Sequence, residues 1–315
     1  MFKFIKLVQN ENMKTFRRVS SIVMLAILLC ALGGVGAINK HYDTKDGKQT
    51  WQQQLQAENQ TLEKQLKEHP NNSMKETLAI NTYRLDHNIK PQDRSTSFWG
   101  NIADDAANGM QLVMIFAIII AGGIVSSEFG SGTIKLLLTR PVSRSTILLS
   151  KYVSTLFTIL VYTFACFIFS CLVSATFFGL DGLSSPYLFY QDGAVHEGNM
   201  LLHVFGQYGF QLIPTVMFVT LAFLISTVFR NSALAIGLSI FGLMAGSLVL
   251  QFIGRFTWSK YVIFSNLDLT PYFHGGGEPF REGMTLGFSI TVLAIYYMVF
   301  IAITWISFKK RDVTA

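Results

Sequence analysis

The chain has 315 residues, of which 50% are hydrophobic and only 14% are charged. Soluble globular proteins carry about a quarter of charged residues, so this composition excludes an ordinary soluble protein. The formal net charge is +6, but the basic residues mostly flank long apolar runs. That placement is typical of membrane topology and not of nucleic-acid binding. We therefore expect an all-α polytopic membrane protein with no nucleic-acid partner.

Residues 1–18 interleave apolar and basic side chains at roughly helical spacing. A basic amphipathic helix of this kind is typical of a segment that lies in the membrane interface. We expect a cytoplasmic interface helix at 1–18, with a disordered basic tail as the alternative.

Six apolar runs follow this segment. Each reaches about 20 residues, which is long enough to cross the hydrocarbon core of a bilayer. The first run is too long for the apolar part of a typical signal peptide. We place the six spans near 19–38, 108–127, 147–179, 203–229, 232–254 and 284–308.

The distribution of charge predicts the orientation of the spans. If the N-terminus is cytoplasmic, the inside segments hold 13 of the 25 basic residues but only 3 of the 19 acidic ones. Cytoplasmic loops of membrane proteins carry this excess of lysine and arginine. We therefore expect both termini on the cytoplasmic side.

The outer segments differ in character. Residues 39–107 carry apolar residues at helical spacing on both sides of Pro70, which predicts an extracytoplasmic helical hairpin domain. Near its end, Asp104 and Asp105 are adjacent; we expect them to cap the start of the second span, with cation binding as the alternative.

Residues 180–200 form an acidic loop. Residues 255–283 mix aromatic residues with glycine and proline, which predicts a short re-entrant or interfacial segment.

The sequence contains no motif for catalysis or nucleotide binding. A phosphate-binding loop, a zinc-protease motif and a nucleophile elbow are all missing. The predicted spans hold almost no ionisable residue, and His203 at a span edge is the only candidate. Carriers coupled to ions usually show several such residues. We expect a non-catalytic subunit without a metal or bound cofactor, and we regard an intramembrane enzyme as the least favoured class.

The segment between the second and third spans is the most informative part of the chain. Ser131 or Thr133 can begin a short helix, and Pro141 ends it. Gly130 and Gly132 allow the backbone to turn sharply before it. We predict a coupling helix near 128–146, which a cytoplasmic partner could push as a lever on two spans. The alternative is a basic loop with helix caps.

This segment resembles the corresponding segment of bacterial ATP-binding-cassette permeases of the second export class, also called type 2 permeases. The residues that carry the resemblance are Glu128, Gly132, Thr133, Leu136, Leu137, Pro141, Ser143, Arg144 and Lys151. In topology the resemblance covers nearly the whole chain, but agreement in motifs is limited to this segment. The hairpin at 39–107 departs from the minimal family pattern, so the substrate class is not carried over.

The resemblance implies partners. A permease of this family dimerises with a second copy or a homologous permease, in the bacterial cytoplasmic membrane. It docks two separate ATPase subunits, which bind ATP-Mg. Glu128, Arg140 and Arg144 are expected to make polar contacts with them. The full set of expected coupling residues is Glu128, Phe129, Gly132, Thr133, Leu136, Arg140, Pro141, Arg144 and Lys151. The glycines expected to support close helix approach between copies are Gly33, Gly34, Gly36, Gly242 and Gly246.

Two functions follow as hypotheses. The first is the permease subunit of an ATP-driven exporter for an amphipathic or hydrophobic substrate, such as a peptide antibiotic or a lipid, with a role in antibiotic resistance. The second is a membrane sensor or scaffold that binds an external ligand or partner through 39–107. A neighbouring ATPase gene would favour the first.

Overall fold

The computed structural model describes residues 2–43, 50–69, 71–92, 97–133, 142–180, 182–273 and 279–310. Six of its helices are long and apolar enough to cross a membrane. They are α2 (Val19–Asp43), α5 (Phe98–Ile124), α8 (Arg144–Phe178), α9 (Met200–Phe229), α10 (Ser232–Ile253) and α12 (Leu286–Lys310). The chain is an all-α polytopic membrane protein, as the sequence predicts.

Shorter elements lie between these helices. They are α1 (Phe2–Phe16), α3 (Trp51–Glu68), α4 (Asn72–Asp86), α6 (Ser126–Gly130), α11 (Ile263–Asn266), the 3-10 helices η1 (Thr257–Tyr261) and η2 (Thr270–Tyr272), and the strands β1 (Tyr187–Gln191) and β2 (Ala194–Gly198).

The core of the bundle is built around α5 and α9, which pack along each other and against α8 and α10. Ile118 and Ala121 of α5 meet Val219 and Phe223 of α9 in one fully buried cluster. The outer helices α10 and α12 instead leave large apolar side chains exposed, including Met244. Apolar side chains on the outside of a bundle are stable in contact with lipid.

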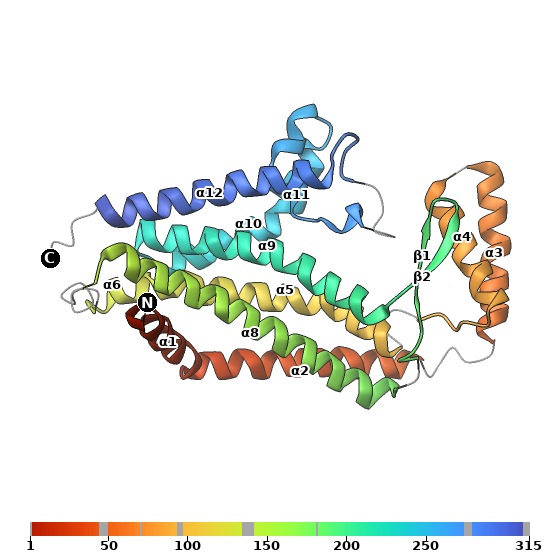
Figure 1. Ribbon diagram of the computed structural model, residues 1–315, viewed down its shortest axis with the longest axis horizontal. Coiled ribbons are helices and arrows are strands. Elements are labelled where there is room, and N and C mark those ends of the chain that lie inside the picture. Colours follow the sequence, from red (N-terminus) through yellow and green to blue (C-terminus); the bar gives the residue numbers. More distant parts are fainter. Residues whose placement is uncertain are drawn as a thin grey trace.

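The two ends of the bundle differ (Figure 1). The start of α1 and the end of α12 lie at one end, together with α6. At the opposite end stand α3 and α4, which pack against each other, and the β1–β2 pair, which contacts α4. An even number of crossings returns the chain to the side where it began, in agreement with six spans.

The second span begins ten residues earlier than the predicted 108. Ser97 caps α5, because its hydroxyl accepts a hydrogen bond from Gly100 N at 3.1 Å. Asp104 and Asp105 therefore lie two turns inside the helix, and the prediction that they cap its start is wrong. Asp105 is buried and accepts a hydrogen bond from Asn101. This polar partner allows the helix to continue past the buried carboxyl group.

The acidic loop predicted at 180–200 contains a β-hairpin. Strands β1 and β2 are antiparallel, with Tyr187 opposite Gly198 and Gln191 opposite Ala194. Asp192 and Gly193, the two turn residues, both have positive φ, at 52° and 85°. An Asp-Gly pair with positive φ at both residues is the favoured two-residue hairpin turn.

Two of the glycines predicted to serve contacts between copies are used within the chain. A Cβ at Gly246 would lie 2.7 Å from the Phe264 ring, so Gly246 allows α11 to pack against α10. A Cβ at Gly36 would lie 2.6 Å from Val173, where α2 meets α8. Gly33 and Gly34 face open space and stay available for the predicted role.

Candidate functional site

The described parts of the segment 128–151, residues 128–133 and 142–151, lie at the end of the bundle that holds α1 and the end of α12 (Figure 1). Glu128 and Phe129 belong to α6, a short helix that directly follows α5. Gly132 has a φ of +71°, a conformation that glycine adopts freely, whereas Gly130 is the last residue of α6. The predicted coupling helix after this turn falls largely on residues outside the described ones. Thr133 is exposed. Leu136, Arg140 and Pro141 lie outside the described residues.

The third span begins at Arg144, the first residue of α8. Ser143 caps it by accepting a hydrogen bond from Thr146 N at 3.2 Å, as its sequence position predicts. Lys151 lies two turns further along α8 and is 1% exposed. Lysine is almost never buried to this extent unless it is paired.

Four charged side chains from three helices form one cluster around Lys151. The Lys151 ammonium lies 2.9 Å from the carboxylate of Glu11 on α1 and 2.7 Å from that of Glu128 on α6. Lys14 of α1 contacts the same two carboxylates, at 3.0 Å and 3.2 Å. We call these four residues the ion-pair cluster. Each of its charges is opposed by two charges of the other sign.

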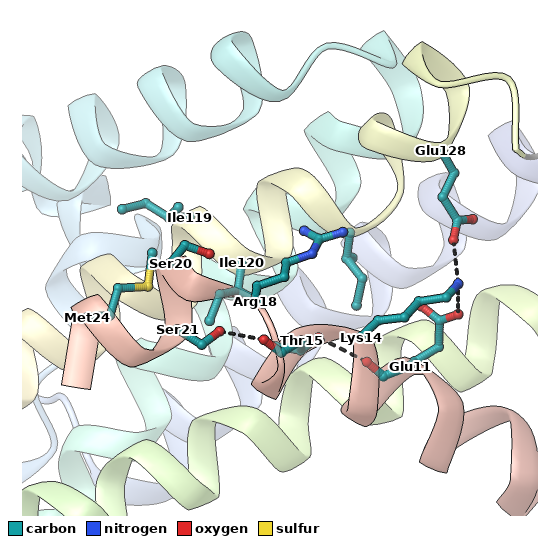
Figure 2. Close-up of a pocket in the computed structure, with 11 residues that line it drawn as sticks. Glu11, Lys14, Thr15, Arg18, Ser20, Ser21, Met24, Ile119, Ile120 and Glu128 are labelled. Atoms are coloured by element: carbon teal, nitrogen blue, oxygen red, sulfur yellow. Dashed lines mark hydrogen bonds and ion pairs between the residues drawn. The ribbon is translucent and has the colours of Figure 1, made fainter. Parts of the chain in front are cut away.

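A small cavity opens beside the ion-pair cluster. Figure 2 shows Glu128 reaching from α6 toward Lys14, with Arg18 and Ser21 lining the same space. Its volume is about 90 Å³. Glu128 Oε2 has no hydrogen-bond partner among the described residues. Because a cavity of this size has room for water and Glu128 lines it, solvent can satisfy that oxygen.

Electrostatics in the cluster favour the charged forms. Burial by itself would raise the pKa of Glu11, but the ammonium groups of Lys151 and Lys14 outweigh it and hold the pKa below the ordinary value of 4.5. Burial would likewise lower the pKa of Lys14, yet Glu11 and Glu128 raise it above the ordinary 10.5. Both groups are therefore ionised across the physiological range.

A second set of contacts holds α6 from the side of α9. The Arg230 guanidinium, at the turn between α9 and α10, lies 4.4 Å from the centre of the Phe129 ring. Ser126 N donates to the hydroxyl of Ser226 on α9 at 3.2 Å. Thus α6 is fixed to α1 and α8 through Glu128, and to α9 through Ser126 and Phe129.

The structure qualifies the roles expected from the sequence. Glu128 points into the cluster and is 8% exposed, so its direct contact with another protein stays a prediction. The geometry gives it the role of positioning α6. Sequence reasoning missed Glu11 and Lys14 as its partners. The available signal was that Glu11 is the only acidic residue among the first 18, on a helix otherwise basic.

The site has no constellation suited to metal binding. Among the residues that the structure describes, no three histidine, cysteine, aspartate or glutamate side chains gather as a metal would require. The cluster consists of internally neutralised carboxylates and ammonium groups. Its chemistry is therefore that of a structural junction between helices.

These features define a multi-pass membrane protein whose first helix, second span and third span are joined by buried ion pairs. The chain belongs to the family described as "Protein of unknown function (DUF2705)", whose model matches residues 83–314. It is 42% identical over 314 residues to "Uncharacterized protein YhcI" of Bacillus subtilis (strain 168), covering 98% of this chain and 99% of that one. It is 33% identical over 204 residues to "Uncharacterized membrane protein YdbK" of the same organism, covering 64% and 78%.

Proposed function

We propose that this chain is the permease subunit of an ATP-driven exporter, moved by separate ATPase subunits that bind at the segment 128–151. The observation that carries the proposal is the attachment of α6 to three neighbouring helices. The segment after α6 connects the second and third spans. A force on this segment reaches α5 and α8 through the backbone, α1 through the ion-pair cluster, and α9 through Phe129.

The first helix supports the same proposal. Phe16 of α1 packs edge to face on Phe157 of α8, at 6.4 Å between ring centres. Ile5, Lys6 and Met13 of α1 are exposed. An exposed face that combines apolar and basic side chains suits the membrane interface. The excess of basic residues at this end favours the cytoplasmic side of a bacterial membrane.

The proposed substrate is amphipathic or hydrophobic, such as a peptide antibiotic or a lipid. The six long helices carry few charged groups that would hold a free ion. The energy would come from ATP-Mg on the partner subunits, because the chain lacks a phosphate-binding loop of its own. A second copy or a homologous permease would complete the pathway.

Co-expression with the ATPase encoded nearest to this gene tests the proposal. The tagged chain is purified in detergent, and the bound ATPase and its ATP hydrolysis are measured in lipid nanodiscs. We expect a stable complex whose hydrolysis rate changes when an amphipathic peptide or lipid substrate is added. A chain that purifies without any ATPase, or a complex whose rate no substrate alters, would contradict the proposal.

A second candidate function rests on the opposite end of the bundle. Between α4 and β2 lies an open pocket of about 450 Å³, lined by Leu78, Tyr83 and Val195 among others. Tyr83 donates a hydrogen bond to Glu197 of β2 at 3.1 Å, which joins the hairpin of strands to α4. An assembled outer domain with a pocket favours binding of an external ligand or partner, as a sensor or scaffold requires.

Replacing residues 50–88 by a glycine-serine linker separates the two functions. If the chain is a permease whose outer domain is accessory, the complex keeps its ATPase activity and its response to substrate. If the chain is a sensor, the response to the external ligand disappears while assembly in the membrane is retained.

A further inference from the structure

A second polar site lies inside the bundle, away from the ion-pair cluster. Its centre is Asp105 of α5, which is 3% exposed and lies seven residues beyond the start of the helix at Phe98. Because α5 is among the helices long and apolar enough to cross a membrane, Asp105 is a carboxyl group within a candidate membrane-spanning helix. Such residues are rare, and each is a candidate functional site.

The partners of Asp105 are neutral and come from two helices. Asn101 Nδ2 donates to Asp105 Oδ2 at 3.2 Å and to the Ser174 hydroxyl of α8 at 2.9 Å. The Ser170 side chain of α8 also lies beside Asp105. The Tyr208 hydroxyl of α9 donates to Ser170 at 3.1 Å, which extends the network to a third helix.

The ionisable groups near Asp105 carry no positive charge. Besides Asp104 on the same helix, they are Cys166 of α8 and Tyr208 of α9. The adjacent helix α2 contributes apolar side chains, Leu28 and Leu32, to the hydrophobic cluster that also contains Cys166 and Tyr208. No lysine, arginine or histidine in the described part of the chain forms an ion pair with Asp105, in contrast to Glu11 and Glu128.

An ionised carboxylate in this place would be buried without a counter-charge, which is strongly unfavourable. A protonated carboxyl avoids that penalty and suits the neutral hydrogen-bonding groups around it. We propose that Asp105 is a proton-binding site within the membrane-spanning part of the chain, occupied by a proton in the conformation described here. On release, the carboxyl O–H bond breaks, its electron pair stays on the carboxylate, and the proton passes to water.

Release requires water to reach Asp105, and close packing prevents this in the described conformation. At Gly109, one turn further along α5, a Cβ would lie 3.0 Å from both Cys166 and Leu32. Separation of α8 from α5 would break the Asn101–Ser174 bond and admit water. Occupancy by a proton is thereby linked to the distance between α5 and α8. This inference does not depend on an ATPase partner.

Infrared spectroscopy of the full chain in lipid nanodiscs tests the inference. A protonated carboxyl group has a carbonyl band that a carboxylate lacks. We expect this band to persist at a pH at which exposed aspartates have ionised, to shift on 13C-aspartate labelling, and to disappear in Asp105→Asn. Asp104→Asn, a change in the adjacent and more exposed acid, should keep it.

Two outcomes would overturn the inference. One is the absence of a labelled acid band in the wild-type chain at that pH, which means that Asp105 is ionised. The other is a band that Asp105→Asn retains or that Asp104→Asn removes. If Asp105→Asn does not fold, Asp105→Glu takes its place, and the acid band should then no longer shift on 13C-aspartate labelling. A fold that tolerates asparagine without loss of thermal stability is expected, because asparagine has nearly the shape of the protonated acid.

Discussion

The ammonium group of Lys151 lies 2.7 Å from the carboxylate of Glu128, although these residues stand at the two ends of the segment 128–151, on α8 and α6. This contact therefore joins the first and last residues of the segment. Glu11 of the first helix binds the same ammonium at 2.9 Å. The junction therefore unites the start of the chain with both spans that the segment connects.

Lys151→Met should lower stability strongly. It leaves Glu11 and Glu128 buried with only Lys14 to neutralise them, and removal of one partner from a buried ion pair typically costs about 3–5 kcal/mol. Thermal unfolding in detergent measures the change. Lys309→Met, at an exposed site near the end of α12, is the matched control and should stay within about 0.5 kcal/mol of wild type. An equal loss of stability in both variants would contradict the role of Lys151 in the ion-pair cluster.

The ion-pair cluster should give stability a defined pH window. The folded pKa of Glu11 is below its ordinary 4.5, so its contribution is present above that value and is lost as pH falls through the lower folded pKa. The folded pKa of Lys14 is above 10.5, so its contribution is present below that value and is lost as pH rises further. Unfolding temperatures measured across pH should therefore fall at both extremes.

Glu11→Gln provides the control for the acidic side of this window. The variant should be less stable than wild type near neutral pH, and the difference should shrink as the pH falls below the ordinary pKa of glutamate. A difference that does not change with pH would show that the charge of Glu11 is not what stabilises the junction.

The contact between Phe129 and Arg230 should be measurable by a double-mutant cycle. A guanidinium over an aromatic face contributes about 0.5–2 kcal/mol, with larger values where water is excluded. Phe129→Leu and Arg230→Gln, alone and combined, give the coupling energy from thermal unfolding. We expect a coupling of about 1 kcal/mol. Strict additivity of the two changes would mean that α6 is not held to the α9–α10 turn in this way.

Replacement by alanine should have different effects at Gly246 and at Gly242. A Cβ at Gly246 meets the Phe264 ring at 2.7 Å, whereas one at Gly242 has its nearest neighbour, Phe218, at 3.8 Å. Gly246→Ala should therefore displace Phe264 and loosen α11, seen as faster proteolysis of the 255–283 segment. Gly242→Ala should leave the cleavage rate unchanged. The reverse order would contradict the packing of Phe264 against Gly246.

The sequence predicts the six spans well because a run of about 20 apolar residues is a local property. The predicted start of α5 lies ten residues too late, because a carboxyl group such as that of Asp105 is not expected inside a span when its partners are unknown. Asn101 lies one turn away on the same helix, but the serines of α8 are brought to this place only by packing. The β-hairpin has a local signal in Asp192-Gly193, because this pair of residue types favours a two-residue turn with positive φ.

The candidate site was predictable in part. Glu128 and Lys151 stand out by their position around the segment between two spans. Their contacts with α1 join Lys151 to Glu11, 140 positions apart in the chain, and Glu128 to Lys14, 114 positions apart, and no periodicity reports contacts of that range. For the same reason the inward direction of Glu128 could not be read from its charge.

The central claim is that an ATPase acts on this chain at the segment 128–151, and cross-linking measures this most directly. In a chain without native cysteines, Thr133→Cys places a thiol at an exposed position beside α6, and Thr61→Cys places a control thiol on exposed α3. With a bifunctional thiol-to-amine reagent, the co-expressed ATPase should be captured from position 133 and not from 61, and ATP-Mg should alter the yield. Capture from 61 alone, or from neither position while a complex is present, would contradict the account.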